Sequence, residues 1–329
     1  MPKFTYLPAV AGLAFGATGA LAETPVLQVL TYDSFVSEWG PGPAIEAAFE
    51  ETCACDLQFL GAGDGAALLA RLQLEGPRTD ADIVLGLDTN LTAVARKTGL
   101  FAPHGVDAAL DLPIDWEDAD FLPFDWGYFA FVGNADDPAP ASLKALAESD
   151  IKIAIQDPRS STPGLGLLMW VKTAYGDDAA EIWTGLSDNI VTVTPGWSEA
   201  YGLFVDGEVD AVLSYTTSPA YHLIAEEDPS KVAWAFDEGH YVQVEVAGKL
   251  AGTDQPELAD QFMAFMVSEA FQSVIPTTNW MYPAVTPASG LPDGFETLIN
   301  PEKPLLLSAE DAAEKRDAAL DEWRNALSQ

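Results

Sequence analysis

The chain has 329 residues, of which 48% are hydrophobic, with 51 Asp or Glu against 15 Lys or Arg. Its formal net charge of −36 disfavours nucleic acid and anionic membrane surfaces as partners. The length and apolar content are ample for a large core, and more than one domain is usual at this size.

The first 22 residues have the pattern of a secretory signal peptide. Lys3 is their only charged residue, 7–20 is a short apolar run, and Ala20-Leu21-Ala22 fits the small-x-small cleavage pattern. The run is too short to span a bilayer. We therefore expect the mature chain to be exported as a soluble protein, which is periplasmic if the organism is a Gram-negative bacterium.

Short apolar runs alternate with helical patterns along the mature chain, which predicts an α/β fold with mostly parallel sheets. The expected strands are 26–31, 82–87, 128–132, 152–156, 210–214 and 242–246. The expected helices are 44–51, 66–75, 143–148, 166–175, 198–205, 256–267 and a last helix that runs from a capping box at Ser308 and Asp311 to about Leu327.

Cys53 and Cys55 form a Cys-x-Cys pair. In an oxidising compartment they can close a small disulfide. A metal site would need further ligands, and none of the three histidines lies at ligand spacing. A redox site usually has two residues between its cysteines. We interpret the pair as a structural disulfide or two inert thiols, and we predict no metal site and no cofactor.

The segment Gly61-Ala-Gly-Asp-Gly-Ala66 lies between a strand-like run and a helical pattern. It matches the lenient dinucleotide-binding pattern G-x-G-x-x-A, and Asp88 ends a later strand. The alternative is a flexible loop before a helix, which the short and permissive match favours. Such a loop exposes Asp64 and Gly65 to a ligand.

A second turn, 157–164, follows the expected strand at 152–156. Ser161 or Thr162 can cap the next helix, with Pro163 in its first turn. The free backbone N–H groups and hydroxyls of such a turn form a natural anion cradle. Plain helix capping explains the same residues without a ligand.

Aromatic and hydroxyl side chains follow several of the expected strands. Loops of this kind meet at the carboxyl ends of parallel strands, where rings can stack on a flat ligand and hydroxyls can hold its polar edge. Ordinary surface turns are the alternative. The candidate contacts are the aromatic residues Tyr32, Trp197, Tyr215, Tyr221 and Trp280 and the hydroxyl residues Thr216, Thr217 and Ser218.

Catalytic patterns are few in the sequence. No serine lies in a G-x-S-x-G elbow, and there is no H-E-x-x-H motif and no phosphate-binding loop. A site of paired carboxylates stays an alternative with 51 acidic residues in the chain, but no pattern singles out a pair. We therefore predict no catalytic residue.

Two runs, 123–134 and 240–248, have the pattern of strands that pass between two lobes. A hinge of two strands allows bending without unfolding, which suits a clamshell. The expected division is a discontinuous first lobe of residues 23–124 and 246–329 and a second lobe of residues 125–245.

The chain resembles the periplasmic thiamine-binding proteins of bacterial ABC importers along nearly the whole mature sequence. The resemblance implies a type II periplasmic-binding-protein fold, in which two lobes, each a mostly parallel sheet flanked by helices, are joined by a two-strand hinge. It is carried by 32–35, 39–43, 82–88, 124–131, 156–168, 191–204, 213–221 and 275–283.

The resemblance also implies roles for individual residues. Asp64 and Gly65 match the family's first-lobe contact loop, and Ser161 and Thr162 match its phosphate-end turn. The second-lobe contacts correspond to Trp197 and 215–218, and the aromatic walls to Tyr221 and Trp280, with Tyr32 as a further candidate. The implied ligands are thiamine, thiamine phosphate and thiamine diphosphate, and the implied partner is an ABC permease. We expect a monomer without enzymatic activity.

Two departures leave the preference for phosphate esters open. Pro195 stands where a basic residue is expected, and the loop 61–63 is richer in glycine. The same fold can also bind another small cation, or an iron complex through Tyr215 and Tyr221. An exported thiamine-cleaving enzyme is a further alternative, and it would need a nucleophilic cysteine in the cleft.

Overall fold

The structure is a computed structural model that describes residues 24–328, so the expected signal peptide lies outside the described residues. Its main strands form one hydrogen-bonded path in the order β2-β1-β3-β10-β5-β8-β6-β7. Parallel pairing joins β2 (Asp56–Gly61), β1 (Val26–Thr31) and β3 (Ile83–Asp88). It also joins β8 (Ala211–Tyr215), β6 (Ile153–Gln156) and β7 (Ile190–Thr194).

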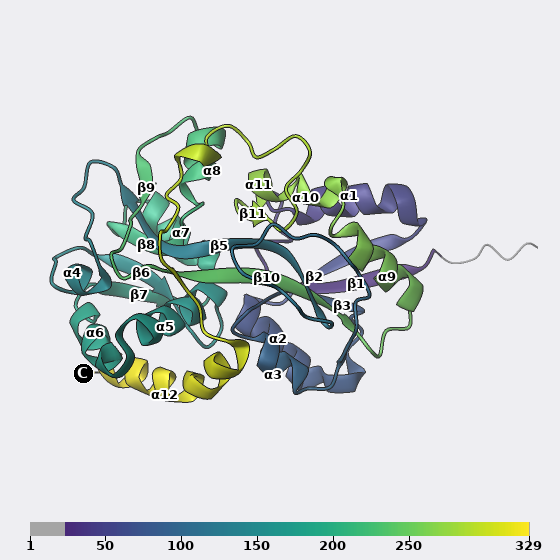
Figure 1. Ribbon diagram of the computed structural model, residues 1–329, viewed down its shortest axis with the longest axis horizontal. Helices are drawn as coiled ribbons and strands as arrows, with labels where there is room; N and C mark the ends of the chain where they lie inside the picture. Colours follow the sequence, from purple (N-terminus) through teal and green to yellow (C-terminus); the bar gives the residue numbers. More distant parts are fainter. Residues whose placement is uncertain (1–23, 329) are drawn as a thin grey trace, which may run out of the picture.

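Two long antiparallel strands connect these parallel groups. β5 (Phe121–Asn134) and β10 (His240–Leu250) pair with one another, and they run side by side across the middle of the molecule (Figure 1). β10 pairs with β3 on one side, and β5 pairs with β8 on the other. Four short strands pair with β5 or β10: β4 (Phe101–Ala102), β9 (Lys231–Ala233), β11 (Tyr282–Pro283) and β12 (Pro304–Leu305).

We call the part around β1, β2 and β3 the first half. Apolar side chains on both faces of these strands explain why helices cover both faces (Figure 1). For example, Phe49 of α1 meets Phe262 of α9 edge-on at 5.2 Å between ring centroids. The helices of this half are α1 (Gly42–Cys53), α2 (Gly65–Glu75), α3 (Thr92–Arg96), α9 (Pro256–Phe265), α10 (Glu269–Gln272) and α11 (Ile275–Thr278).

We call the part around β6, β7 and β8 the second half. The nearly all-apolar helix α5 (Thr162–Tyr175) is buried against β10 and α6 (Ala179–Leu186), while α7 (Trp197–Val205) covers β6 and β8. The last helix, α12 (Ala309–Leu327), packs on α5, α6 and α3 (Figure 1). The remaining helices are α4 (Leu143–Ala147), α8 (Pro219–Ala225) and the short 3-10 turns 76–78, 176–178 and 295–297.

The expected α/β architecture is confirmed, and most expected elements lie within a few residues of the observed ones. The runs 123–134 and 240–248, expected to pass between the lobes, agree with β5 and β10, and the strand expected at 128–132 is the middle of β5. α5 begins four residues before the expected helix at 166–175. α3, α6, α8, α10 and α11 have no counterpart among the expected helices. Ser308 caps α12 as predicted, because its hydroxyl accepts the backbone N–H of Asp311.

Cys53 and Cys55 form a disulfide where α1 passes into β2. Ala54 between them has φ of 51°, so the chain turns in the left-handed region at this point. None of the helices within residues 24–328 combines the length and apolar character needed to cross a bilayer.

Candidate ligand-binding site

A cavity of about 550 Å³ opens where the carboxyl ends of the strands from both halves meet. Its size lies within the usual range for small-molecule sites. Ligands of open α/β sheets bind at this end of the strands because the following loops and helix N-termini converge there. Seven of the predicted site residues line it: Tyr32, Asp64, Trp197, Tyr215, Ser218, Tyr221 and Trp280.

One aromatic wall is built around Trp197 at the start of α7. Its ring stacks on Tyr201 at 4.8 Å between centroids, and its Nε1 donates to the Ser214 hydroxyl at 2.8 Å. Trp39 of the first half lies 6.2 Å from it. Stacking and hydrogen bonding hold the Trp197 ring in one orientation, with Tyr201 beside it along the cavity.

A second aromatic wall joins the two halves. Tyr221 of α8 and Trp280, which follows α11, meet edge-on at 5.5 Å between ring centroids. The Tyr221 hydroxyl donates to Glu226 at 2.8 Å, which fixes its ring. Trp280 has φ of 55°, a rare conformation for a bulky residue that typically marks a functional constraint.

The hydroxyl-rich turn after β8 is only partly exposed to the cavity. Ser218 lines it, and its Oγ accepts the Tyr215 backbone N–H at 3.2 Å and lies 2.7 Å from the Ser214 hydroxyl. Thr216 and Thr217 are buried and do not line the cavity. The Thr217 hydroxyl donates to the Met281 sulfur at 3.6 Å, and Met281 lines the cavity.

The predicted phosphate-end turn touches the first half directly. The Ser161 hydroxyl donates to Asp64 Oδ2 at 2.7 Å, so that carboxylate lies at the N-terminus of α5. A Cβ on Gly65 would lie 2.1 Å from Thr162 Oγ1, which explains why glycine is needed here. Gly65, Ser161 and Thr162 are buried at this contact and do not line the cavity. Their roles toward a ligand stay predictions.

Burial raises the pKa of Asp64, and the hydrogen bonds from Ser161 and Gly65 act in the opposite direction. The same carboxylate caps α2 by accepting the Gly65 backbone N–H at 2.8 Å. The segment 61–66 is therefore a loop and helix cap, and an acidic side chain occupies the anion-binding end of α5.

Sequence reasoning named Tyr32 but missed the other residues of the polar floor of the cavity. Tyr32 donates to Glu245 Oε2 at 3.0 Å, and Asn279 Nδ2 donates to the Tyr32 hydroxyl at 2.9 Å and to Asp125 Oδ2 at 2.6 Å. We call Tyr32, Asp125, Glu245 and Asn279 the cleft floor. Residues 242–246 read Val-Gln-Val-Glu-Val, and a charged residue among these valines was the signal available in the sequence.

Burial strongly perturbs the acids of the cleft floor. It raises the pKa of Asp125 to about 7 and that of Glu245 well above its usual range, and the charge of Asp125 raises the pKa of Glu245 further. Burial and the nearby Glu245 and Asp125 carboxylates also raise the pKa of Tyr32. Acids with such values gather at functional sites, and here Glu245 lines the cavity while Asp125 is buried beside it.

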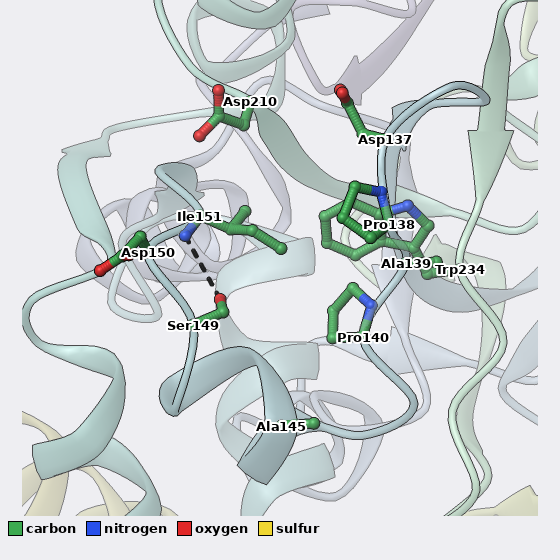
Figure 2. Close-up of a pocket in the computed structure, with 10 residues that line it drawn as sticks. All are labelled: Asp137, Pro138, Ala139, Pro140, Ala145, Ser149, Asp150, Ile151, Asp210 and Trp234. Atoms are coloured by element: carbon green, nitrogen blue, oxygen red, sulfur yellow. Dashed lines mark hydrogen bonds between the residues drawn. The ribbon is translucent and has the colours of Figure 1, made fainter.

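A second hollow of about 520 Å³ lies at the opposite ends of the strands (Figure 2). Asp150 and Asp210 stand just before β6 and β8, at the amino ends of these strands. The centre is apolar, with Pro138, Ile151 and Trp234, and the carboxylates lie at its edge (Figure 2). It has no convergent polar groups, so the first cavity is the candidate site.

A family model described as bacterial extracellular solute-binding protein matches residues 44–277. The chain is 52% identical over 316 residues to the thiamine-binding periplasmic protein of Escherichia coli (strain K12), with 94% of this chain and 96% of that protein covered. The chain therefore belongs to the bacterial extracellular solute-binding proteins, and among them to the thiamine-binding periplasmic proteins. The resemblance found in the sequence is thereby confirmed.

Solved structures agree with this assignment. A structure named periplasmic thiamin binding protein superimposes with a TM-score of 0.91 and 52% identity, covering 94% of this chain and 98% of that one. Iron-bound HitA from Pseudomonas aeruginosa superimposes with a TM-score of 0.74 at 20% identity, over 92% of this chain and 99% of that one. The second likeness shows the shared fold, and the expected periplasmic-binding-protein architecture is confirmed.

Proposed function

We propose that this chain captures thiamine in the cleft between its two halves and delivers it to the permease of an ABC importer. The chain acts in the periplasm as a monomer and carries out no catalysis. The name of the 52% identical Escherichia coli relative supports the ligand and the compartment.

The lining of the cavity carries the proposal. Its walls present the faces of tryptophan and tyrosine rings, and its floor presents the Glu245 carboxylate. Among residues 24–328, no Lys, Arg or His lines it. Thiamine combines a flat aminopyrimidine with a cationic thiazolium. Aromatic faces attract both rings, and a cation over an aromatic ring gains about 0.5–2 kcal/mol.

Capture requires the cleft to open and close. We propose that lobes of residues 23–124 with 246–329 and of residues 125–245 bend about β5 and β10. Support comes from the pairing of β10 with β3 and of β5 with β8, which makes these two strands the sheet connection between the halves. α12 falls within the bounds of the first of these lobes, yet it packs on α5 and α6 of the second as well as on α3 of the first, so it spans the two.

The disulfide argues against a thiamine-cleaving enzyme. The sequence contains two cysteines, both are joined in the Cys53–Cys55 bond, and neither lines the cavity. The nucleophile that such an enzyme needs is therefore not presented to a ligand.

We extend the proposal to thiamine phosphate and thiamine diphosphate, whose phosphate would approach the N-terminus of α5. The Ser161 hydroxyl and the Thr162 backbone N–H suit an anion there, whereas the Ser161 N–H already donates to the Asp157 carbonyl. The Asp64 carboxylate already occupies this position, so we expect the esters to bind more weakly than thiamine.

Isothermal titration of the mature chain with thiamine tests the proposal. We expect saturable one-to-one binding of thiamine. Choline, a small cation without flat rings, and ferric citrate serve as control ligands and are expected to bind far more weakly. An absence of thiamine binding, or equal binding of choline, contradicts the proposal. A coloured protein that retains iron would favour the iron-complex alternative.

A further inference from the structure

Two acids face one another on the strands that connect the halves. Asp125 of β5 and Glu245 of β10 are cross-strand partners in the antiparallel register. Directly opposed residues of such a pair point to the same face of the sheet. Asp125 is fully buried and Glu245 is 6% exposed, at the cavity lining. We call these two side chains the carboxyl pair.

Neutral donors hold the carboxyl pair in place. Glu245 Oε2 accepts from the Tyr32 hydroxyl at 3.0 Å, and its Oε1 accepts from Gln243 Nε2 at 2.8 Å. Asp125 Oδ2 accepts from Asn279 Nδ2 at 2.6 Å, whereas its buried Oδ1 has no hydrogen-bond partner. The pair is therefore oriented but not neutralised by these contacts.

The titratable groups that act on the carboxyl pair supply no positive charge. Asp64 at α2 and Asp88 at the end of β3 add negative charge, while Tyr32 after β1 and Tyr215 at the end of β8 are neutral, because burial and the pair itself raise their pKa well above the usual value. None of the ion pairs found within residues 24–328 includes Asp125 or Glu245.

Two buried carboxylates without a cation beside them cannot both ionise at neutral pH, so the carboxyl pair on its own holds a proton. Its proton belongs to the pair rather than to one residue. A cation that enters the cavity supplies the missing positive charge. The bound proton then leaves for the solvent, so that one positive charge replaces another.

We propose that the carboxyl pair is the counter-charge that selects a cationic ligand, and that ligand capture expels the proton held by the pair. This inference rests on the proposed function, because thiamine supplies the cation. The thiazolium charge is fixed and cannot be lost as a proton. A protonated aminopyrimidine would instead bring its own proton, and its capture would release none.

Proton counting tests the inference. Thiamine is titrated into the wild-type chain in phosphate and in Tris, two buffers with different ionisation enthalpies, from about pH 6 to about pH 8. We expect release of up to one proton per ligand near neutral pH. The affinity should rise by up to about tenfold per pH unit and level off above the pKa of the pair. Zero net release overturns the inference.

Glu245→Gln keeps the shape of the side chain and removes its charge. We expect this variant to bind thiamine at least about tenfold more weakly at about pH 8, with no proton release and a flat pH profile. Gln243→Leu is the matched control, because it removes a hydrogen bond from the same carboxylate at a residue that does not line the cavity, and it leaves the charges. It should keep the proton release. Thermal melting confirms that both variants fold.

Thiochrome, an uncharged fused-ring relative of thiamine, provides a ligand control. Its affinity should be the same for the wild type and Glu245→Gln, and its binding should release no proton. If the wild type binds no thiamine, the proposed function fails and this inference falls with it. If Glu245→Gln binds thiamine as tightly as the wild type, the inference alone is overturned.

Discussion

Replacing Asp64 with asparagine should shift the ligand preference toward phosphate esters. In the structure, Asp64 Oδ2 accepts from Ser161 at 2.7 Å and thereby places a carboxylate at the N-terminus of α5. A phosphate that approaches this helix end meets that negative charge. Asparagine removes the charge, keeps an acceptor for the Gly65 N–H and is an equally good N-cap.

The magnitude follows from Coulomb's law. Two unit charges about 4 Å apart interact by about 4 kcal/mol at an effective dielectric constant of about 20, and by about 1 kcal/mol in water. Asp64 is half-buried, so we expect a value near the lower end. The affinity for thiamine monophosphate relative to thiamine should therefore increase by roughly tenfold.

The assay is isothermal titration of the wild type and Asp64→Asn with thiamine and with thiamine monophosphate. Ser160→Ala is a matched control, because the Ser160 hydroxyl donates to the Pro195 carbonyl at the edge of the same turn and carries no charge. An unchanged ratio of the two affinities in Asp64→Asn would refute the reasoning. A loss of thiamine binding alone would show that Asp64 is needed for closure.

Three further predictions concern the pH dependence of stability, the aromatic wall and the disulfide. The buried carboxyl pair of Asp125 and Glu245 holds a proton in the folded chain up to about pH 7, whereas the unfolded chain loses its carboxyl protons near pH 4. The free energy of unfolding should therefore fall as the pH rises from about 4 to 7, by up to about 4 kcal/mol for each proton held, and it should fall less in Asp125→Asn, as chemical denaturation at each pH would measure. Trp197→Ala should weaken thiamine binding by roughly 10- to 100-fold because the ring that stacks on Tyr201 is lost, whereas Trp197→Phe should retain most of the affinity in the same titration. Reduction of the Cys53–Cys55 disulfide should leave thiamine binding unchanged, because neither residue lines the cavity; a change in affinity after dithiothreitol would contradict this.

Local patterns were sufficient to predict most of the fold. Ser308 and Asp311 predicted the start of α12, and the strand 26–31 agrees with β1. The run 123–134 agrees with β5 except at its start, where Pro123 lacks a backbone donor and lies beside a register shift opposite Val246. The helices α3, α6, α8, α10 and α11 were missed because each has only four to eight residues, which show little of a 3.6-residue pattern.

The site was predictable where its residues follow strands in sequence. Trp197, Tyr215 and Trp280 could be chosen because loops after parallel strands converge. The pairing of Asp125 with Glu245 depends on the register of two strands far apart in the chain, which neither segment encodes alone. The burial of Thr216 and Thr217 depends likewise on how the halves meet.

The contact between Trp39 and Trp197 gives the protein an optical signal of its own. Their indole rings belong to different halves and lie 6.2 Å apart between centroids, tilted by 54°. Transitions of two indoles this close couple and produce a pair of circular-dichroism bands of opposite sign. Separation of the halves would abolish the coupling, so the loss of these two circular-dichroism bands should show, without any label, that the cleft has opened.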